Sequence, residues 1–170
     1  MARSLWGPYS GFGLGVAIAA CLVDQLSKFW LLHAFDLADR GAVHVAPFID
    51  FVLTWNTGIS YGWFQQEGPL GQTVLLAFKV VAVVLLWLWL ARSHYRLPAL
   101  SLGLIIGGAI GNALDRFLYG AVADFVLFHV QTATWRFNWY VFNLADVAIV
   151  AGVIGLLYES SMGGSAPKAP

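Results

Sequence analysis

The chain has 170 residues, with 59% hydrophobic side chains, 11% charged side chains and a net charge of zero. A typical soluble domain carries about 25% charged residues, so this composition favours a protein solvated by lipid, and the neutral balance argues against nucleic acid as a partner. The single cysteine, Cys21, excludes an internal disulfide and a cysteine-based metal cluster. The length predicts a single membrane domain over residues 1–170.

Four apolar segments are each close to the roughly 20 residues that a membrane-spanning helix needs. They cover about residues 11–32, 70–91, 97–118 and 139–158. The sequence therefore predicts an all-α integral membrane protein with four transmembrane helices. Lys79 interrupts the second segment, and the sequence reveals no role for it.

The connections between these segments differ in length and character. A long loop, about 34–69, contains two extended stretches at 43–45 and 48–55, which predict strands of a small extracytoplasmic sheet. A second loop covers about 119–138. The small, polar tail at about 160–170 is predicted to be disordered.

Positive charges predict the orientation in the membrane. Four spans place both termini on one side, together with the basic turn at 92–96. Because basic residues favour the cytoplasmic side, both termini are predicted to be cytoplasmic and both long loops periplasmic. The basic residues in question are Arg3, Arg92, Arg96 and Lys168, and the loop aromatics Tyr61, Trp63 and Phe64 are predicted to lie at the opposite interface.

Polar side chains inside apolar helices are costly and therefore need an explanation. They lie late in the first and third segments, just beyond the third, and early in the fourth, so all of them are predicted to gather near the periplasmic face. Spacings of three or four residues put several of them on shared helix faces. The set comprises Asp24, Lys28, Asn112, Asp115, Arg116, Asp124, Asn143 and Asp146.

Two carboxylates in such a site, Asp124 and Asp146, predict acid–base chemistry. When two carboxylates lie close together, one keeps its proton, so one can activate water while the other protonates a carbonyl oxygen. This chemistry needs no metal and no cofactor. Asn112, Arg116 and Asn143 are predicted to orient the carboxylates or hold the substrate, whereas a second group, Asp24 with Lys28, is interpreted as a structural ion pair.

Five motifs resemble those of the bacterial lipoprotein signal peptidase (signal peptidase II) family, over about residues 13–157. Each motif alone is weak, but five in order on matching segments are highly specific. They are Asp24-Gln-Leu-Ser-Lys28, Asn56-Thr-Gly-Ile-Ser-Tyr-Gly62, Gly107-Gly-Ala-Ile-Gly-Asn-Ala-Leu-Asp-Arg116, Val122-Ala-Asp-Phe-Val126 and Phe142-Asn-Leu-Ala-Asp-Val147.

The resemblance implies an inner-membrane aspartic endopeptidase that removes signal peptides from prolipoproteins, cleaving on the N-terminal side of a diacylglyceryl-modified cysteine. It implies that Asp124 and Asp146 are catalytic and that globomycin-type inhibitors bind. The remaining motif positions would bind substrate or orient the site. They are Asn56, Gly58, Asn112, Arg116 and Asn143, with Asp24 and Lys28 beside them. After Gly58 the chain departs from the family's usual small residues followed by Phe.

Other classes of protein fit the sequence less well. A transporter or proton-pathway subunit also uses buried carboxylates, but these gather near one face and form no chain across the membrane. The Gly-x-Ser-x-Gly match at 58–62 lacks the strand–turn–helix context and the His–acid pair of a serine hydrolase. The four histidines show no His-x-x-x-His or His-Glu-x-x-His spacing, so no metal site is predicted. They are His33, His44, His94 and His129.

Overall fold

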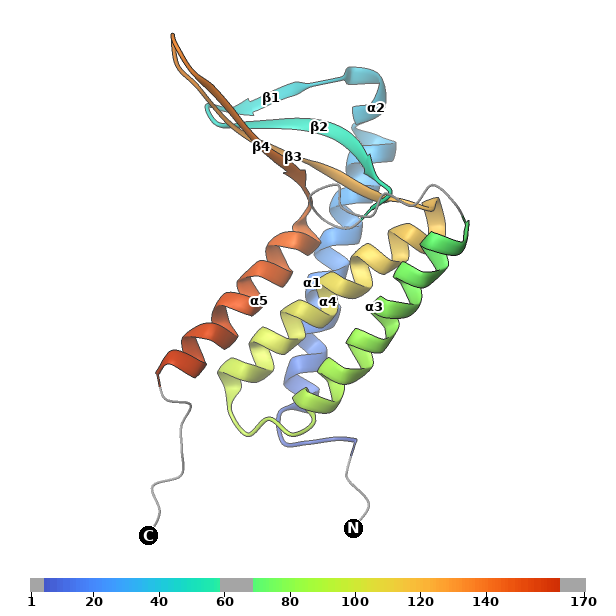
Figure 1. The fold of residues 1–170 in the computed structure, drawn as a ribbon, viewed down its shortest axis with the longest axis vertical. Helices are drawn as coiled ribbons and strands as arrows, with labels where there is room; N and C mark the ends of the chain where they lie inside the picture. Colours follow the sequence, from blue (N-terminus) through green and yellow to red (C-terminus); the bar gives the residue numbers. More distant parts are fainter. Residues whose placement is uncertain (1–4, 59–68, 163–170) are drawn as a thin grey trace.

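The computed structural model, which describes residues 5–58 and 69–162, is a helix bundle with a small sheet over one end (Figure 1). The long helices are α1 (Ser10–Phe29), extended by a π-helical turn η1 (Trp30–Ala34), α3 (Pro69–Leu90), α4 (Arg96–Tyr119) and α5 (Leu144–Ser161). The predicted loop aromatics, Ser60 and the predicted disordered tail beyond 162 lie outside the described residues.

Helix α4 is the central helix and packs against α1, α3 and α5. The core between them contains Ala17, Leu90, Ala99, Leu102 and Ile106. The outward faces of the helices, by contrast, carry large apolar side chains in the open, among them Phe78, Leu85 and Phe117. Because an apolar surface of this extent is unfavourable in water, lipid is the solvent that it suits.

Three helices within the described residues are long and apolar enough to cross a membrane. They are Ser10–Ala34, Arg96–Tyr119 and Leu144–Ser161, while the apolar stretch found in α3, Ala77–Leu90, is shorter. The chain is therefore built as a multi-pass membrane protein.

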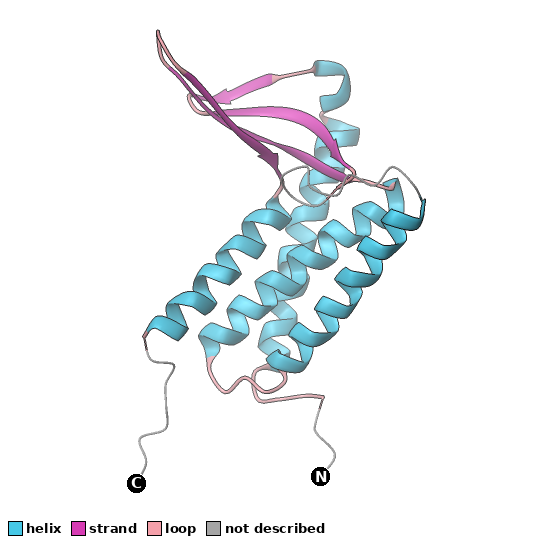
Figure 2. Ribbon diagram, in the orientation of Figure 1, coloured by secondary structure: helices cyan, strands magenta, loops and turns pink. Residues whose placement is uncertain are grey.

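The sheet has four antiparallel strands in the order β1-β2-β3-β4 (Figure 2). Strands β1 (Val43–Ala46) and β2 (Ile49–Asn56) lie in the first loop, where the sequence predicts strands. Strands β3 (Val122–Gln131) and β4 (Arg136–Phe142) occupy the second loop. The predicted combination of apolar helices with a small sheet is therefore present, but the description as all-α is too narrow, because the second loop, where no strand was predicted, contributes β3 and β4.

The predicted start of the fourth span at Trp139 differs from the structure for a physical reason. Residues up to Phe142 pair with β3, with Phe142 opposite Val126, so their apolar side chains belong to a strand. A short apolar run cannot be assigned to helix or strand from its composition alone. The helix begins only after Asn143, whose side chain caps it.

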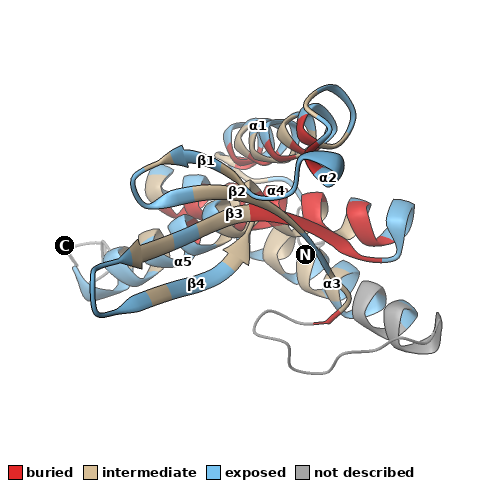
Figure 3. Ribbon diagram, turned by 90° about the horizontal axis from the view of Figure 1, so that it is seen from above, coloured by how far each residue is buried: buried red, intermediate tan, exposed pale blue. Residues whose placement is uncertain are grey.

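The two ends of the bundle differ. The start of α1, the turn between α3 and α4 and the end of α5 lie at the end away from the sheet (Figure 1). At the sheet end, the short helix α2 (Leu37–Arg40) closes a second apolar core containing Leu31, Leu37 and Phe125. The first residues of β3 are buried here, as the view from above shows (Figure 3). This buried stretch carries Asp124.

Candidate active site

Asp124 lies in the buried first half of β3, opposite Thr54 of β2, and is 4% exposed. One carboxylate oxygen accepts a hydrogen bond from the Asn56 side-chain amide at 3.1 Å. The other accepts one from the Asn143 side-chain amide at 2.6 Å. The sheet thus supplies one partner for this carboxylate and the start of α5 supplies the other.

Asp146 lies in the first turn of α5 and forms a capping box with Asn143. The Asp146 backbone N–H donates to Asn143 Oδ1 at 3.0 Å, and the Asn143 backbone N–H donates to Asp146 Oδ2 at 3.3 Å. Asn112 of α4 donates to Asp146 Oδ1 at 2.9 Å. Asn143 therefore bonds both carboxylates, and this shared contact brings Asp124 and Asp146 together.

Burial and charge together perturb the acidity of Asp124. Burial raises the pKa of Asp124 to about 6, and the negative charge of Asp146 acts in the same direction. The hydrogen bonds from Asn56 and Asn143 lower it by stabilising the ionised form. A carboxyl whose pKa approaches neutrality can exchange protons with water and substrate, as acid–base catalysis requires.

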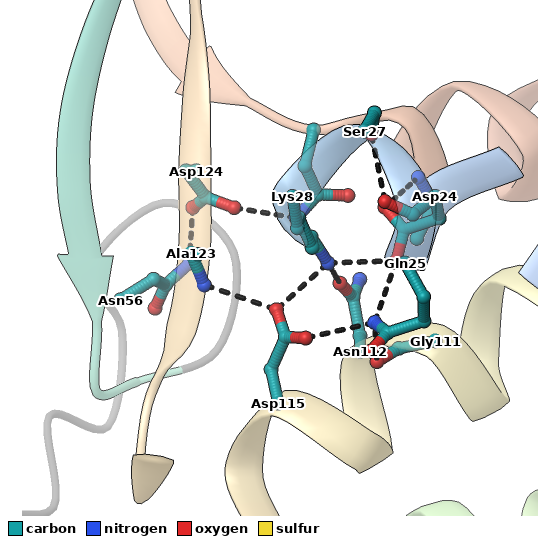
Figure 4. A network of polar contacts seen from close by, with 12 residues as sticks. Asp24, Gln25, Ser27, Lys28, Asn56, Gly111, Asn112, Asp115, Ala123 and Asp124 are labelled. Atoms are coloured by element: carbon teal, nitrogen blue, oxygen red, sulfur yellow. Dashed lines mark hydrogen bonds and ion pairs between the residues drawn. The ribbon is translucent and has the colours of Figure 1, made fainter. Parts of the chain in front are cut away.

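A second group of buried charges lies beside Asp124 (Figure 4). The Lys28 ammonium group contacts Asp24 Oδ2 at 2.8 Å and Asp115 Oδ2 at 2.7 Å, and donates to Asn112 Oδ1 at 3.2 Å. All three charged side chains are at most 3% exposed. We call Asp24, Lys28 and Asp115 the ionic hub. The predicted pair of Asp24 and Lys28 is thus part of a larger unit.

The ionic hub also holds the backbone on either side of the carboxylate pair. Asp115 Oδ2 accepts from the N–H of Ala123 at 3.1 Å, and Ala123 directly precedes Asp124. Asp24 Oδ1 accepts from the N–H of Ala145 at 2.9 Å, and Ala145 directly precedes Asp146. Each hub carboxylate therefore fixes the residue before one member of the pair.

Sequence reasoning assigned no role to two residues of this network. Gln25 donates to Asp24 Oδ2, to Asp115 Oδ1 and to the carbonyl of Gly111, at 3.1, 2.8 and 3.1 Å. Asp115 joins α4 to α1 and β3. Both lie inside the motifs, Gln25 next to Asp24 and Asp115 next to Arg116. Their position beside predicted site residues was the one feature of the sequence that could have indicated a role for them.

Two glycines of α4 allow the helices to approach closely at the site. A Cβ atom on Gly111 would lie 2.6 Å from Asp24 Oδ2. One on Gly108 would lie 2.5 Å from the carbonyl oxygen of Ala145. Only a residue without a side chain leaves room here for the hub carboxylate and for the start of α5.

Arg116 and Gly58 connect α4 to the chain after β2. The Arg116 guanidinium donates to the carbonyl of Gly58, whose N–H donates in turn to Asn56 Oδ1 at 3.0 Å. The charge of Arg116 also interacts with Asp124 and Asp146. Lys79 of α3, which had no predicted role, interacts electrostatically with Arg116 and Asp146. The structure therefore gathers all the predicted site residues at one end of the bundle.

Comparison with known protein families shows to which family a chain with this site belongs. Residues 16–162 match the model of the family described as signal peptidase (SPase) II. The chain belongs to the signal peptidase II family. It is therefore an aspartic-type protease whose function is the cleavage of signal peptides, and the family does not favour the transporter alternative.

Individual relatives agree with this assignment. The chain is 65% identical to a lipoprotein signal peptidase of Nitrobacter hamburgensis and 60% identical to one of Rhodopseudomonas palustris, in each case over 93% of this chain and 96% of the relative. Two solved structures described as bacterial membrane enzymes share the fold at 22% identity, with TM-scores of 0.74 and 0.72. They cover 94% and 88% of this chain, and this chain covers 94% and 92% of theirs.

Proposed function

We propose that Asp124 and Asp146 are the catalytic pair of this signal peptidase. The observation that carries the proposal is the contact of both carboxylates with Asn143, the Asp124 side chain through the amide at 2.6 Å and the Asp146 side chain through the backbone N–H at 3.3 Å. Two carboxylates that hydrogen-bond to the same residue support a pair that acts together on one water molecule and one peptide bond.

The proposed reaction uses the two carboxyl groups in opposite protonation states. The ionised member takes a proton from water, and the water oxygen attacks the carbonyl carbon of the scissile peptide bond. The protonated member gives its proton to the carbonyl oxygen. When the tetrahedral gem-diol intermediate collapses, the C–N bond breaks and the leaving nitrogen takes up the proton held by the base. One hydroxyl returns its proton to the other carboxylate as the carbonyl re-forms, so the pair regains its starting protonation state. The raised pKa of Asp124 supports a pair that shares one proton near neutral pH.

The amide side chains orient the pair. Asn143 donates to both Asp124 and Asn112, and Asn112 donates to Asp146, which forms a continuous path from one carboxylate to the other. Asn56 holds Asp124 from the sheet. We assign Arg116 and Gly58 to the placement of the chain that follows β2, beside the substrate.

The substrate that we propose is a prolipoprotein whose cysteine carries a diacylglyceryl group, with cleavage on the N-terminal side of that cysteine. The relatives named lipoprotein signal peptidase support this choice. Exposed apolar helix faces next to the site also suit acyl chains that remain in the bilayer. Globomycin-type inhibitors would occupy the same site.

We further propose that α1, α3, α4 and α5 all span the inner membrane as one domain, with both termini in the cytoplasm. The sheet would then lie on the periplasmic face, and the carboxylate pair just below it. Basic residues at the end away from the sheet, such as Arg92 and Arg96, support this orientation.

Cleavage of a lipidated prolipoprotein tests the catalytic assignment. Asp124→Asn and Asp146→Asn should each lower turnover at least about a thousandfold, because each removes one partner of the acid–base pair. Asp39→Asn, at an exposed carboxylate of α2, should cleave as the wild type does. Turnover by either pair variant at the wild-type rate would overturn the assignment.

The proposed lipid requirement is tested by comparing two precursors, one with and one without the diacylglyceryl group. The wild-type enzyme should cleave the lipidated precursor and leave the same precursor without the diacylglyceryl group uncut. Equal cleavage of both precursors would contradict the proposed lipid requirement while leaving the assignment of the two aspartates intact.

A further inference from the structure

A second cluster of potential ligand side chains lies in the sheet, away from the carboxylate pair. His44 of β1, Asp50 of β2 and His129 of β3 lie on three adjacent strands, which Figure 3 shows side by side from above. His44 and Asp50 are opposite each other in the β1–β2 ladder. The His129 backbone N–H donates to the carbonyl of Phe48 at 2.9 Å, which fixes the position of β3 beside the β1–β2 turn.

This cluster could not be predicted from the sequence, because its members are far apart along the chain. Neither histidine has a partner at the short spacings that mark metal sites on one helix or loop. Strand pairing brings them together instead, and the register of β2 against β1 and β3 places a carboxylate between two imidazoles.

The distances within the cluster are those of a ligand set. His44 Nδ1 lies 2.8 Å from Asp50 Oδ1, and His129 Nε2 lies 3.2 Å from Asp50 Oδ2. One ligand atom from each residue lies within 4.8 Å of the others. In a tetrahedral site with bonds of about 2.0–2.1 Å, ligand atoms are roughly 3.3 Å apart. Small side-chain rotations would therefore close these three residues around one ion.

The Nε2 atom of His129 adds an independent observation. It is buried and, among the described residues, has no hydrogen-bond partner, although it lies at an ion-pair distance from Asp50. A buried imidazole nitrogen normally has a partner, and a metal ion would provide one.

We propose that His44, Asp50 and His129 bind one divalent transition metal ion of the zinc class. Two imidazoles with one carboxylate match that class, whereas magnesium and calcium prefer oxygen ligands. The His44 side chain is 67% exposed, so an ion can reach the site from solvent and water can take the remaining position.

The site has a structural consequence for the enzyme. The ion would connect β1, β2 and β3 at the end of the ladder away from the carboxylate pair. The same ladder carries Asn56 on β2 and Asp124 on β3, whose side chains bond each other. Metal binding would therefore brace the two strands that hold one catalytic carboxylate.

Calorimetric titration of the full-length protein in detergent with Zn²⁺ tests the proposal. The wild type should bind one ion per chain, and Asp50→Asn and His129→Gln should each raise the dissociation constant at least about tenfold. His94→Gln is the matched control, because His94 is an exposed histidine in the α3–α4 turn at the other end of the bundle. It should bind Zn²⁺ as the wild type does.

Thermal unfolding distinguishes a metal site from a cluster whose side chains only hydrogen-bond neighbouring strands to each other. Zn²⁺ should raise the unfolding temperature of the wild type and the His94→Gln control, but not that of the cluster variants. If the other two variants fold poorly, His44→Gln replaces them in both measurements, because it removes a proposed ligand whose side chain is exposed. The proposal is overturned if Zn²⁺ does not bind, if all variants bind it equally, or if it leaves the wild-type unfolding temperature unchanged.

Discussion

Two groups of buried carboxylates lie side by side at the sheet end of the bundle, and their partners differ. In the ionic hub, Asp24 and Asp115 both contact the Lys28 ammonium group within 2.8 Å. In the proposed catalytic pair, Asp124 accepts from the amides of Asn56 and Asn143, and Asp146 from the amide of Asn112. The hub carboxylates therefore have a cation as a direct partner, whereas the other two carboxylates have side-chain amides as theirs.

The comparison shows that burial alone does not identify a reactive carboxylate. Asp24 and Asp115 are more deeply buried than Asp124 and Asp146, yet their charges are neutralised by an adjacent cation and directed at backbone N–H groups. Their role in the site is positional. Under the proposed assignment the pair performs the chemistry, and the hub holds the backbone on either side of it.

Removal of the hub cation should give the largest effect on stability. Lys28→Met leaves two buried carboxylates facing each other, which should cost about 3–5 kcal/mol of unfolding free energy. Asp124→Asn should leave the unfolding temperature close to that of the wild type. Thermal unfolding in detergent measures both, and adding Asp24→Asn and Asp115→Asn to Lys28→Met should recover part of the loss. A Lys28→Met protein as stable as the wild type would remove the distinction between the two groups.

Crowding of the hub without any change of charge should have the next largest effect. Gly111→Ala puts a Cβ atom 2.6 Å from Asp24 Oδ2, so the carboxylate must shift from the position in which it accepts from Ala145. We expect a loss of about 1–3 kcal/mol in unfolding free energy and a lower kcat. Gly15→Ala, at a position of α1 where the added Cβ meets nothing within 4 Å, should lower neither quantity. Equal behaviour of the two variants would contradict the close approach.

The two roles of Asn143 should be separable by substitution. Asn143→Ala removes both the helix cap and the amide donor to Asp124, so it should cost about 1 kcal/mol of stability as well as activity. Asn143→Ser retains a capping oxygen and should restore stability alone. Unfolding temperature and kcat, measured on both variants, check this. Recovery of kcat in Asn143→Ser would show that the amide donor is dispensable.

The smallest expected effect is a change in the pH profile. Because the shared proton is lost as pH rises through the raised pKa of Asp124, about 6, kcat/KM should fall on that side. Asn56→Ala removes a hydrogen bond that lowers this pKa, so the falling limb should move to higher pH by a few tenths of a unit. Asn138→Ala, at an exposed asparagine of β4, should leave the profile in place. A shift to lower pH in Asn56→Ala would contradict the assigned sign.

Local patterns in the sequence predicted much of the bundle and the polar residues of the site. Helical spacing placed Asp24 and Lys28 on one face, and their contact at 2.8 Å is what that spacing favours. The local pattern wrongly predicted helix at residues 139–142, where the apolar side chains belong to strand β4. The capping sequence Asn143-Leu-Ala-Asp146 contained the correct helix start, but the apolar run before it concealed the boundary.

The sequence by itself determined that the protein suits lipid as its solvent and which family it belongs to, and it singled out Asp124 and Asp146 as the proposed catalytic residues, because composition and motifs are properties of the chain. Only the tertiary structure decided which carboxylates Lys28 neutralises, that the hub holds Ala123 and Ala145, and that His44, Asp50 and His129 meet. These contacts depend on strand register and on the close approach of helices at Gly108 and Gly111. Both are set by packing between segments that are distant in the chain.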